Sequence, residues 1–151
     1  MNSGLRRLIA SASAIALLHY GVVTAQERKQ FVFSSQDFGF AEIDTTLTFT
    51  AESERTFKIQ YSKLPPNPDL MMLYTSFYFC AARKVARELG FDRYGTLSGQ
   101  NQDQSGTAFF LRPGEVAAQV LGAQFANASA LPVDYPTIAA GCDARASNGK
   151  H

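Results

Sequence analysis

Two runs of alternating apolar and polar residues, separated by a charged stretch, form the clearest pattern in the chain. Apolar side chains stand at every second position from 47 to 51 and again from 57 to 61, with threonine or other polar residues between them. Side chains at every second position of a strand point to the same face of a sheet. The polar "ESER" stretch at 52–55 joins the two runs. We therefore predict a β-hairpin with one buried face over residues 46–62.

The stretch that follows predicts a helix that packs on this sheet. "KLPPNPDL" at 63–70 ends the strand, because its prolines lack backbone donors and restrict φ. Asn67 or Asp69 is a suitable N-cap for a helix over residues 68–89, and Gly90 is a suitable left-handed residue at its end. The apolar positions that recur every three or four residues and are expected to face the sheet are Leu70, Leu73, Phe77, Ala81, Val85 and Leu89.

The first half of this predicted helix is also apolar on its other side. Such a surface is either covered by the protein's own tail or a second helix, or it is presented to a partner. The sequence leaves both alternatives open. The residues of this candidate interaction patch are Met71, Met72, Tyr74, Tyr78 and Phe79.

Weaker patterns complete the expected fold. "FVF" and "SSQDFGFAEID" predict one or two short strand segments, "FDRYGTLSG" and "GTAFFLRPG" a second hairpin with the tip "QNQDQS", and "EVAAQVLGAQFANAS" a short helix. The chain has little periodicity after residue 131, and we expect a disordered tail over residues 143–151. The predicted fold is a single α+β domain over residues 26–142: a small antiparallel sheet of about four strands in two hairpins, packed on one long helix, with a short C-terminal helix.

The first 25 residues predict a signal peptide. Two arginines precede an apolar stretch over residues 8–18, and a Val-Thr-Ala sequence that suits signal peptidase ends at Ala25. Cleavage between Ala25 and Gln26 would make the mature protein periplasmic or secreted and would leave no stable membrane span. The alternative is an uncleaved anchor, because residues 8–25 are nearly long enough to cross a bilayer.

Charge argues against nucleic acid as a partner. Cleavage would remove two of the 14 Lys and Arg residues, leaving 12 against 13 Asp and Glu, a formal charge of −1. Proteins that bind nucleic acid carry a basic surface, so we expect no nucleic-acid partner.

The two cysteines matter because of the predicted export. Cys80 and Cys142 would meet an oxidising compartment, where a disulfide would tie the C-terminal segment to the long helix. The alternative is that Cys80 is a small buried side chain and Cys142 a free thiol. Their spacing does not discriminate between the two.

Side chains suited to catalysis are few. The mature chain would keep one histidine, the terminal His151, so histidine-dependent nucleophilic catalysis and histidine zinc sites lack their central group. Glu42 and Asp44 share one face of a candidate strand and Asp92 follows the helix, but solvent-facing and turn roles account for all three. The loop around Asp103 has too few carboxylates for calcium. We expect no enzyme, no cofactor and no metal site.

A further set of motifs spans residues 38–98. A Gly-Phe-x-Glu segment precedes a strand ending in an aromatic residue, and an Ala-Ala-containing helix ends in Gly-Phe-Asp-x-Tyr. The positions involved are Gly39, Phe40, Glu42, Tyr61, Ala81, Ala82, Gly90, Phe91, Asp92 and Tyr94. This arrangement resembles a group of small, uncharacterised proteobacterial envelope proteins, many of them lipoproteins. The lipid-anchor cysteine of that group has no counterpart here. The resemblance implies an envelope location and carries over no catalytic residues.

These observations favour an exported, non-catalytic envelope domain that binds another envelope component or a small apolar ligand. The first alternative is a structural or accessory subunit that associates through the apolar helix surface at 71–79. The second is an enzyme of unidentified type.

Overall fold

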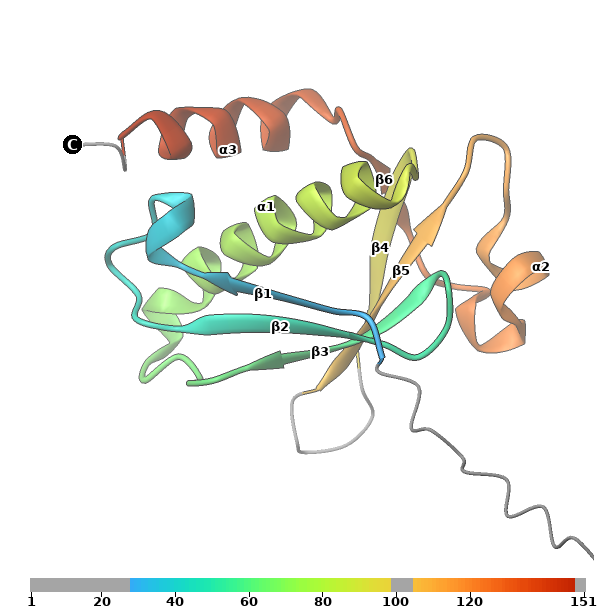
Figure 1. Ribbon diagram of the computed structural model, residues 1–151, viewed down its shortest axis with the longest axis horizontal. Coiled ribbons are helices and arrows are strands. Elements are labelled where there is room, and N and C mark those ends of the chain that lie inside the picture. The colour runs from blue at the N-terminus through green and yellow to red at the C-terminus, as the bar shows by residue number, and fades with distance from the viewer. Residues whose placement is uncertain (1–27, 99–104, 149–151) are drawn as a thin grey trace, which may run out of the picture.

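The computed structural model describes residues 28–98 and 105–148, so the predicted signal peptide and the tip "QNQDQS" lie largely outside the described residues. A six-stranded sheet is covered on one face by helix α1 (Met71–Leu89), and α3 (Pro136–Asn148) lies on the outer side of α1 (Figure 1). The short helix α2 (Ala117–Leu121) packs on the opposite face of the sheet. The strands are β1 (Gln30–Ser34), β2 (Thr46–Ala51), β3 (Thr56–Tyr61), β4 (Arg93–Ser98), β5 (Gly106–Leu111) and β6 (Ala130–Pro132).

Both predicted hairpins are confirmed. β2 pairs antiparallel with β3, with Phe49 opposite Ile59, and β4 pairs antiparallel with β5, with Tyr94 opposite Phe110. The order of strands is β1-β2-β3-β5-β4-β6, and every neighbouring pair is antiparallel. The α+β class is therefore as predicted.

The expected number of about four strands is too small, because the sheet has six. β1 extends it beside β2, and β6 extends it beside β4 at the other border. β6 has only three residues and ends in Pro132, so it is too short to produce an alternating pattern. Its place follows from tertiary contacts, among them a hydrogen bond from the Val133 N–H to the Asp92 carbonyl (2.8 Å).

Of the one or two strand segments predicted for this region only β1 is present, and "SSQDFGFAEID" adds no second one. After β1 it makes a single 3-10 turn, η1 (Gln36–Phe38), and then a loop. The buried Ser35 closes this loop: its hydroxyl donates to the Ile43 carbonyl (2.6 Å) and its N–H donates to the Thr45 carbonyl (3.0 Å). These local bonds satisfy groups that a strand would direct to a neighbour.

Helix α1 has the ends that its sequence predicts. The Asn67 side chain accepts a hydrogen bond from the Leu70 N–H (3.2 Å), and the first turn, Pro68–Leu70, is a 3-10 turn, η2, that leads into the α-helix. Gly90 ends the helix with φ of 75°, a conformation in which glycine has no Cβ to clash.

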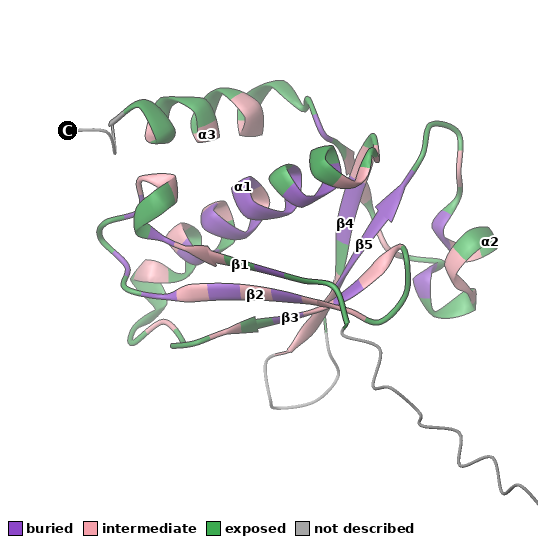
Figure 2. Ribbon diagram, in the orientation of Figure 1, coloured by how far each residue is buried: buried purple, intermediate pink, exposed green. Residues whose placement is uncertain are grey.

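The main core lies between α1 and the sheet (Figure 2). Phenylalanines from the sheet and from the β1–β2 connection meet α1; Phe77, for example, contacts Phe38 and Phe40 with ring centroids 5.6 and 5.8 Å apart. A smaller core lies on the other face of β4 and β5. There, the 3-10 turn η3 (Ala123–Phe125) places Phe125 edge-on to Phe109, at 5.4 Å. A side chain at Gly95 would stand 2.3 Å from the Ser129 carbonyl oxygen, so this close packing requires glycine.

The expected disordered tail over 143–151 is wrong for residues 143–148, which belong to α3. Residues 149–151 lie outside the described residues. Cys142 is joined to Cys80 of α1 by a disulfide, which realises one of the two alternatives for these cysteines. Arg145 donates to the Gly39 carbonyl (3.1 Å), and its guanidinium lies 4.2 Å from the centroid of the Phe40 ring. These contacts hold a helix whose own sequence has little apolar periodicity.

No helix within the described residues is both long enough and apolar enough to cross a bilayer.

Candidate functional site

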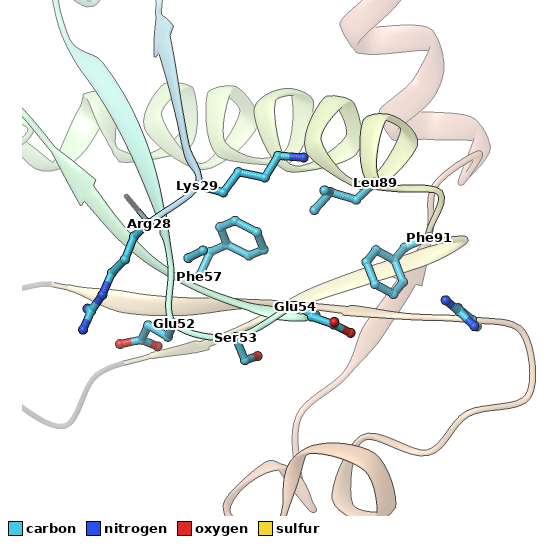
Figure 3. Close-up of a pocket in the computed structure, with 10 residues that line it drawn as sticks. Arg28, Lys29, Glu52, Ser53, Glu54, Phe57, Leu89 and Phe91 are labelled. Atoms are coloured by element: carbon cyan, nitrogen blue, oxygen red, sulfur yellow. The ribbon is translucent and has the colours of Figure 1, made fainter. Parts of the chain in front are cut away.

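A hollow opens where α1 ends (Figure 3). It lies between the start of β1, the turn that joins β2 to β3, and the residues that follow α1, and its volume is about 920 Å³. This volume is in the upper range of small-molecule sites in proteins. Its lining combines apolar side chains with charged ones, which come from segments far apart in the sequence.

The apolar side of the hollow is formed by Phe57, Leu89 and Phe91. Phe57 is only 1% exposed, and its ring meets Phe110 edge-on, with centroids 5.6 Å apart. The left-handed Gly90 reverses the chain after α1, so that the Phe91 ring stacks on Phe110 at 5.9 Å. The end of the helix thereby supplies an aromatic surface that is partly exposed to the hollow.

The charged side of the hollow carries three cations, Arg28, Lys29 and Arg112, and two carboxylates, Glu52 and Glu54. Figure 3 shows the Lys29 side chain extending across the hollow toward the end of α1. Among the described residues, none of these five side chains is in an ion pair. Their charges therefore stay available to a bound molecule.

The turn that carries both carboxylates is held by local hydrogen bonds. The Ser53 hydroxyl oxygen accepts from the N–H groups of Arg55 (3.1 Å) and Thr56 (3.0 Å). The hydroxyls of Ser53 and Thr56 are also within 2.7 Å of each other. Glu52 and Glu54 are thus positioned by an ordered backbone rather than by a free loop.

An ion pair between Arg55 and Glu115 lies next to the Phe91 ring. The Arg55 guanidinium lies 5.5 Å from the centroid of the Phe91 ring and pairs with Glu115, while the Arg112 guanidinium lies 6.0 Å from the same centroid. Hydrogen bonds from the Arg55 side chain and from the Arg112 N–H (2.7 Å) hold the pKa of Glu115 below its ordinary value. The charge of Arg55 is balanced by Glu115, so the positive charge at this end of the hollow comes from Arg112.

Histidine and clusters of metal ligands are two kinds of chemical group on which catalysis often relies. The described residues include no histidine and no group of three or more residues suited to hold a metal ion. Burial raises the pKa of the Tyr94 hydroxyl to about 12, so this group stays protonated at neutral pH. What the hollow offers is a shaped apolar surface with charges at its rim.

The candidate interaction patch on α1 is divided by the packing. Tyr74 and Tyr78 are 4% and 5% exposed, so they belong to the core and contribute no open surface. The Tyr78 hydroxyl donates to the Gly95 carbonyl (3.1 Å). Met71 and Met72 are exposed, and Phe79 is half-buried.

The carboxylates considered for catalysis do not form a pair. Glu42 binds Arg145 of α3 at 3.2 Å, and Asp44 binds Lys63. The backbone N–H of Asp92 donates a hydrogen bond to the Leu111 carbonyl of β5 (3.1 Å). Asp103 lies outside the described residues.

Sequence patterns did not identify the hollow. Its charged residues come from "QERKQ", "ESER" and the segment after β5, which are polar runs that look like ordinary solvated turns. Only the pairing of β1 with β2 and the reversal at Gly90 bring them around one aromatic surface.

Comparison with family models, with curated proteins and with solved structures finds no match to this chain.

Proposed function

We propose that this protein is a non-catalytic binding domain of the cell envelope, and that it holds a small amphipathic molecule in the hollow at the end of α1. The observation that carries the proposal is the combination of about 920 Å³ of space, an aromatic surface and unpaired charges at the rim. Specific small-molecule sites share this plan: apolar walls provide affinity, and a few placed polar groups fix orientation.

The charges define the class of ligand. Three cations against two carboxylates make the lining weakly positive, and Lys29 and Arg112 lie near the apolar surface. The ligand therefore has an apolar or aromatic body that packs against the partly exposed Leu89 and Phe91, and an anionic or zwitterionic head that meets Lys29. This refines the small apolar ligand expected from the sequence.

The envelope location rests on two supports. The N-terminal segment predicts export, and the disulfide between Cys80 and Cys142 is of a kind that persists in oxidising compartments.

The test uses 1-anilinonaphthalene-8-sulfonate, an aromatic sulfonate whose fluorescence rises in apolar surroundings. We expect saturable binding of one probe per chain. Lys29→Glu removes the cation that meets the sulfonate, and Phe91→Ala removes the ring on which the apolar part packs, so each should weaken binding about tenfold or more. The matched control is Lys58→Glu, which makes the same charge change on the outer face of β3. Equal binding by Lys29→Glu and Lys58→Glu would contradict the proposal, as would a signal that appears only when the protein unfolds.

A further inference from the structure

Strand β1 has a free edge. The residues on either side of β1, Lys29 and Ser35, have odd numbers, and their backbone groups bond toward β2. The Ser35 N–H donates to the Thr45 carbonyl (3.0 Å), and the Ala51 N–H donates to the Lys29 carbonyl (2.9 Å). In an antiparallel pair the intervening residues direct both their N–H and C=O groups to the other side. Within the described residues no strand lies on that side (Figure 1). The residues whose backbone groups face this edge are Gln30, Val32 and Ser34.

This edge lacks the usual protections against pairing. Edge strands are normally blocked by proline, by a bulge or by a charge within the strand. β1 reads Gln-Phe-Val-Phe-Ser and pairs with β2 in unbroken register. Its central residue, Val32, is β-branched and 57% exposed. Within the described residues the edge is thus unpaired, uncharged and apolar at its centre.

We propose that β1 pairs antiparallel with β1 of a second copy of this chain, about a two-fold axis at Val32. In this register Gln30 lies opposite Ser34 of the second copy, and Val32 lies opposite its own counterpart. All three residue pairs are of the type that exchanges two hydrogen bonds, so every free backbone group of the edge is satisfied. The two sheets of six strands become one continuous sheet.

The side chains suit this register on both faces. On the outer face the exposed Val32 meets its counterpart. On the inner face Phe31 lies opposite Phe33 of the second copy, at the closer spacing of a pair without mutual hydrogen bonds. Phe33 is only partly buried in one copy, so pairing would cover it and create two cross-strand aromatic pairs.

Charge selects the antiparallel arrangement. Arg28 and Lys29 precede β1, and Asp37 follows it, and within the described residues none of the three is in an ion pair. Antiparallel pairing brings the basic end of one copy to the acidic end of the other at both ends of the contact, whereas parallel pairing would juxtapose like charges. Lys84 of α1 adds a cation at the Asp37 end, over the Phe33 and Phe38 rings (5.5 and 5.6 Å). The complementary contact is therefore the one between Arg28 of one copy and Asp37 of the other.

The test measures association of the purified, disulfide-bonded protein by sedimentation equilibrium. We expect the wild type to form a dimer as its concentration rises from about 1 to 500 µM. Val32→Pro removes an edge-facing N–H but no bond to β2, so we expect its dissociation constant to rise about tenfold or more. Val32→Thr keeps the N–H and the β-branched shape and serves as the matched control, with a change of about twofold or less. A wild type that stays monomeric, or a Val32→Pro variant that dimerises as well as Val32→Thr, would overturn the proposal.

A second pair of variants tests the register without proline. Val32→Lys and Val32→Glu each place like charges opposite one another on the axis, so each alone should dimerise about tenfold more weakly than the wild type. Their mixture places opposite charges there and should restore association as a heterodimer. Failure of the mixture to associate, with both variants folded, would rule out this register.

Discussion

Helices α1 and α3 lie side by side but are held by different forces. Nine of the 19 residues of α1 are buried, and apart from Cys80 and Arg83, which are linked to α3, they are apolar or aromatic side chains of the core, whereas none of the α3 residues whose exposure is described is buried (Figure 2). α1 is stabilised by the removal of apolar area from water, which involves many residues at once. α3 is stabilised by a few specific links. The difference explains why the sequence predicts α1 but not α3: an apolar face repeats every three or four residues, whereas a few specific links leave no repeating pattern.

The links of α3 are covalent and electrostatic. The disulfide joins Cys142 to Cys80, and Arg83 of α1 is buried while its guanidinium donates to Asp143 (3.1 Å) and to the Val133 carbonyl (2.9 Å). At the far end, Arg145 binds Glu42 (3.2 Å). Each link depends on one side chain, so each can be removed by one substitution.

The largest effect is expected in the helix held by packing. Phe77 is fully buried between Phe38 and Phe40, so Phe77→Ala should lower the free energy of unfolding by about 4 kcal/mol through lost burial and a residual cavity. Urea unfolding followed by circular dichroism measures it. Met72→Ala, on the exposed side of the same helix, is the control and should change the free energy by less than about 0.5 kcal/mol. A loss below about 1 kcal/mol for Phe77→Ala would contradict the assignment of stability to this face.

A smaller and more local effect is expected from the disulfide. The bond spans 62 residues, and replacing both Cys80 and Cys142 by alanine should lower the free energy of unfolding by about 3 kcal/mol. Amide hydrogen exchange should then accelerate in both helices, but by a larger factor in α3, because α1 follows the global free energy of unfolding whereas α3 can also open locally once the link is gone. If exchange accelerates by the same factor in both helices, the two are one cooperative unit and the contrast between them fails.

The smallest effect is expected from acid. The pKa of the Glu42 carboxyl lies below its ordinary value of 4.5 because of a hydrogen bond from its own backbone and, beyond that, because of Arg145. A lowered pKa in the folded state means that the carboxylate stabilises the fold above pH 4.5 and that this contribution is lost as the pH falls through the lowered value. We therefore expect exchange at the C-terminal end of α3 to rise, relative to α1, between pH 6 and pH 3. Glu42→Gln should remove this pH dependence, and an unchanged dependence in that variant would assign it to another group.

The sequence predicted the parts of the fold that depend on repeated apolar positions. The β2–β3 hairpin and the body of α1 each bury every second, or every third or fourth, residue, so many residues carry the same signal. Gly90 was also predictable, because a left-handed residue after a helix strongly favours glycine. α3 and β6 were missed because their stability comes from partners far away in the chain, which no local window contains.

The candidate site was missed for a related reason. Lys29, Glu54 and Phe91 belong to segments that the sequence presents as a lead, a turn and a helix end, each with an ordinary local explanation. The same holds for the free edge of β1, because a strand's pattern does not say whether it lies at the border of a sheet.

The amino-acid sequence by itself therefore determined an α+β chain with a long amphipathic helix and an alternating hairpin. The tertiary structure alone decided whether the two cysteines meet, which tyrosines of α1 are buried, where the charged residues gather and which of the described strands border the sheet. The physical reason is the range of the interactions involved. Periodic burial is a property of neighbouring residues along one element, whereas a disulfide, a binding hollow and a sheet border each arise from contacts between segments that only folding brings together.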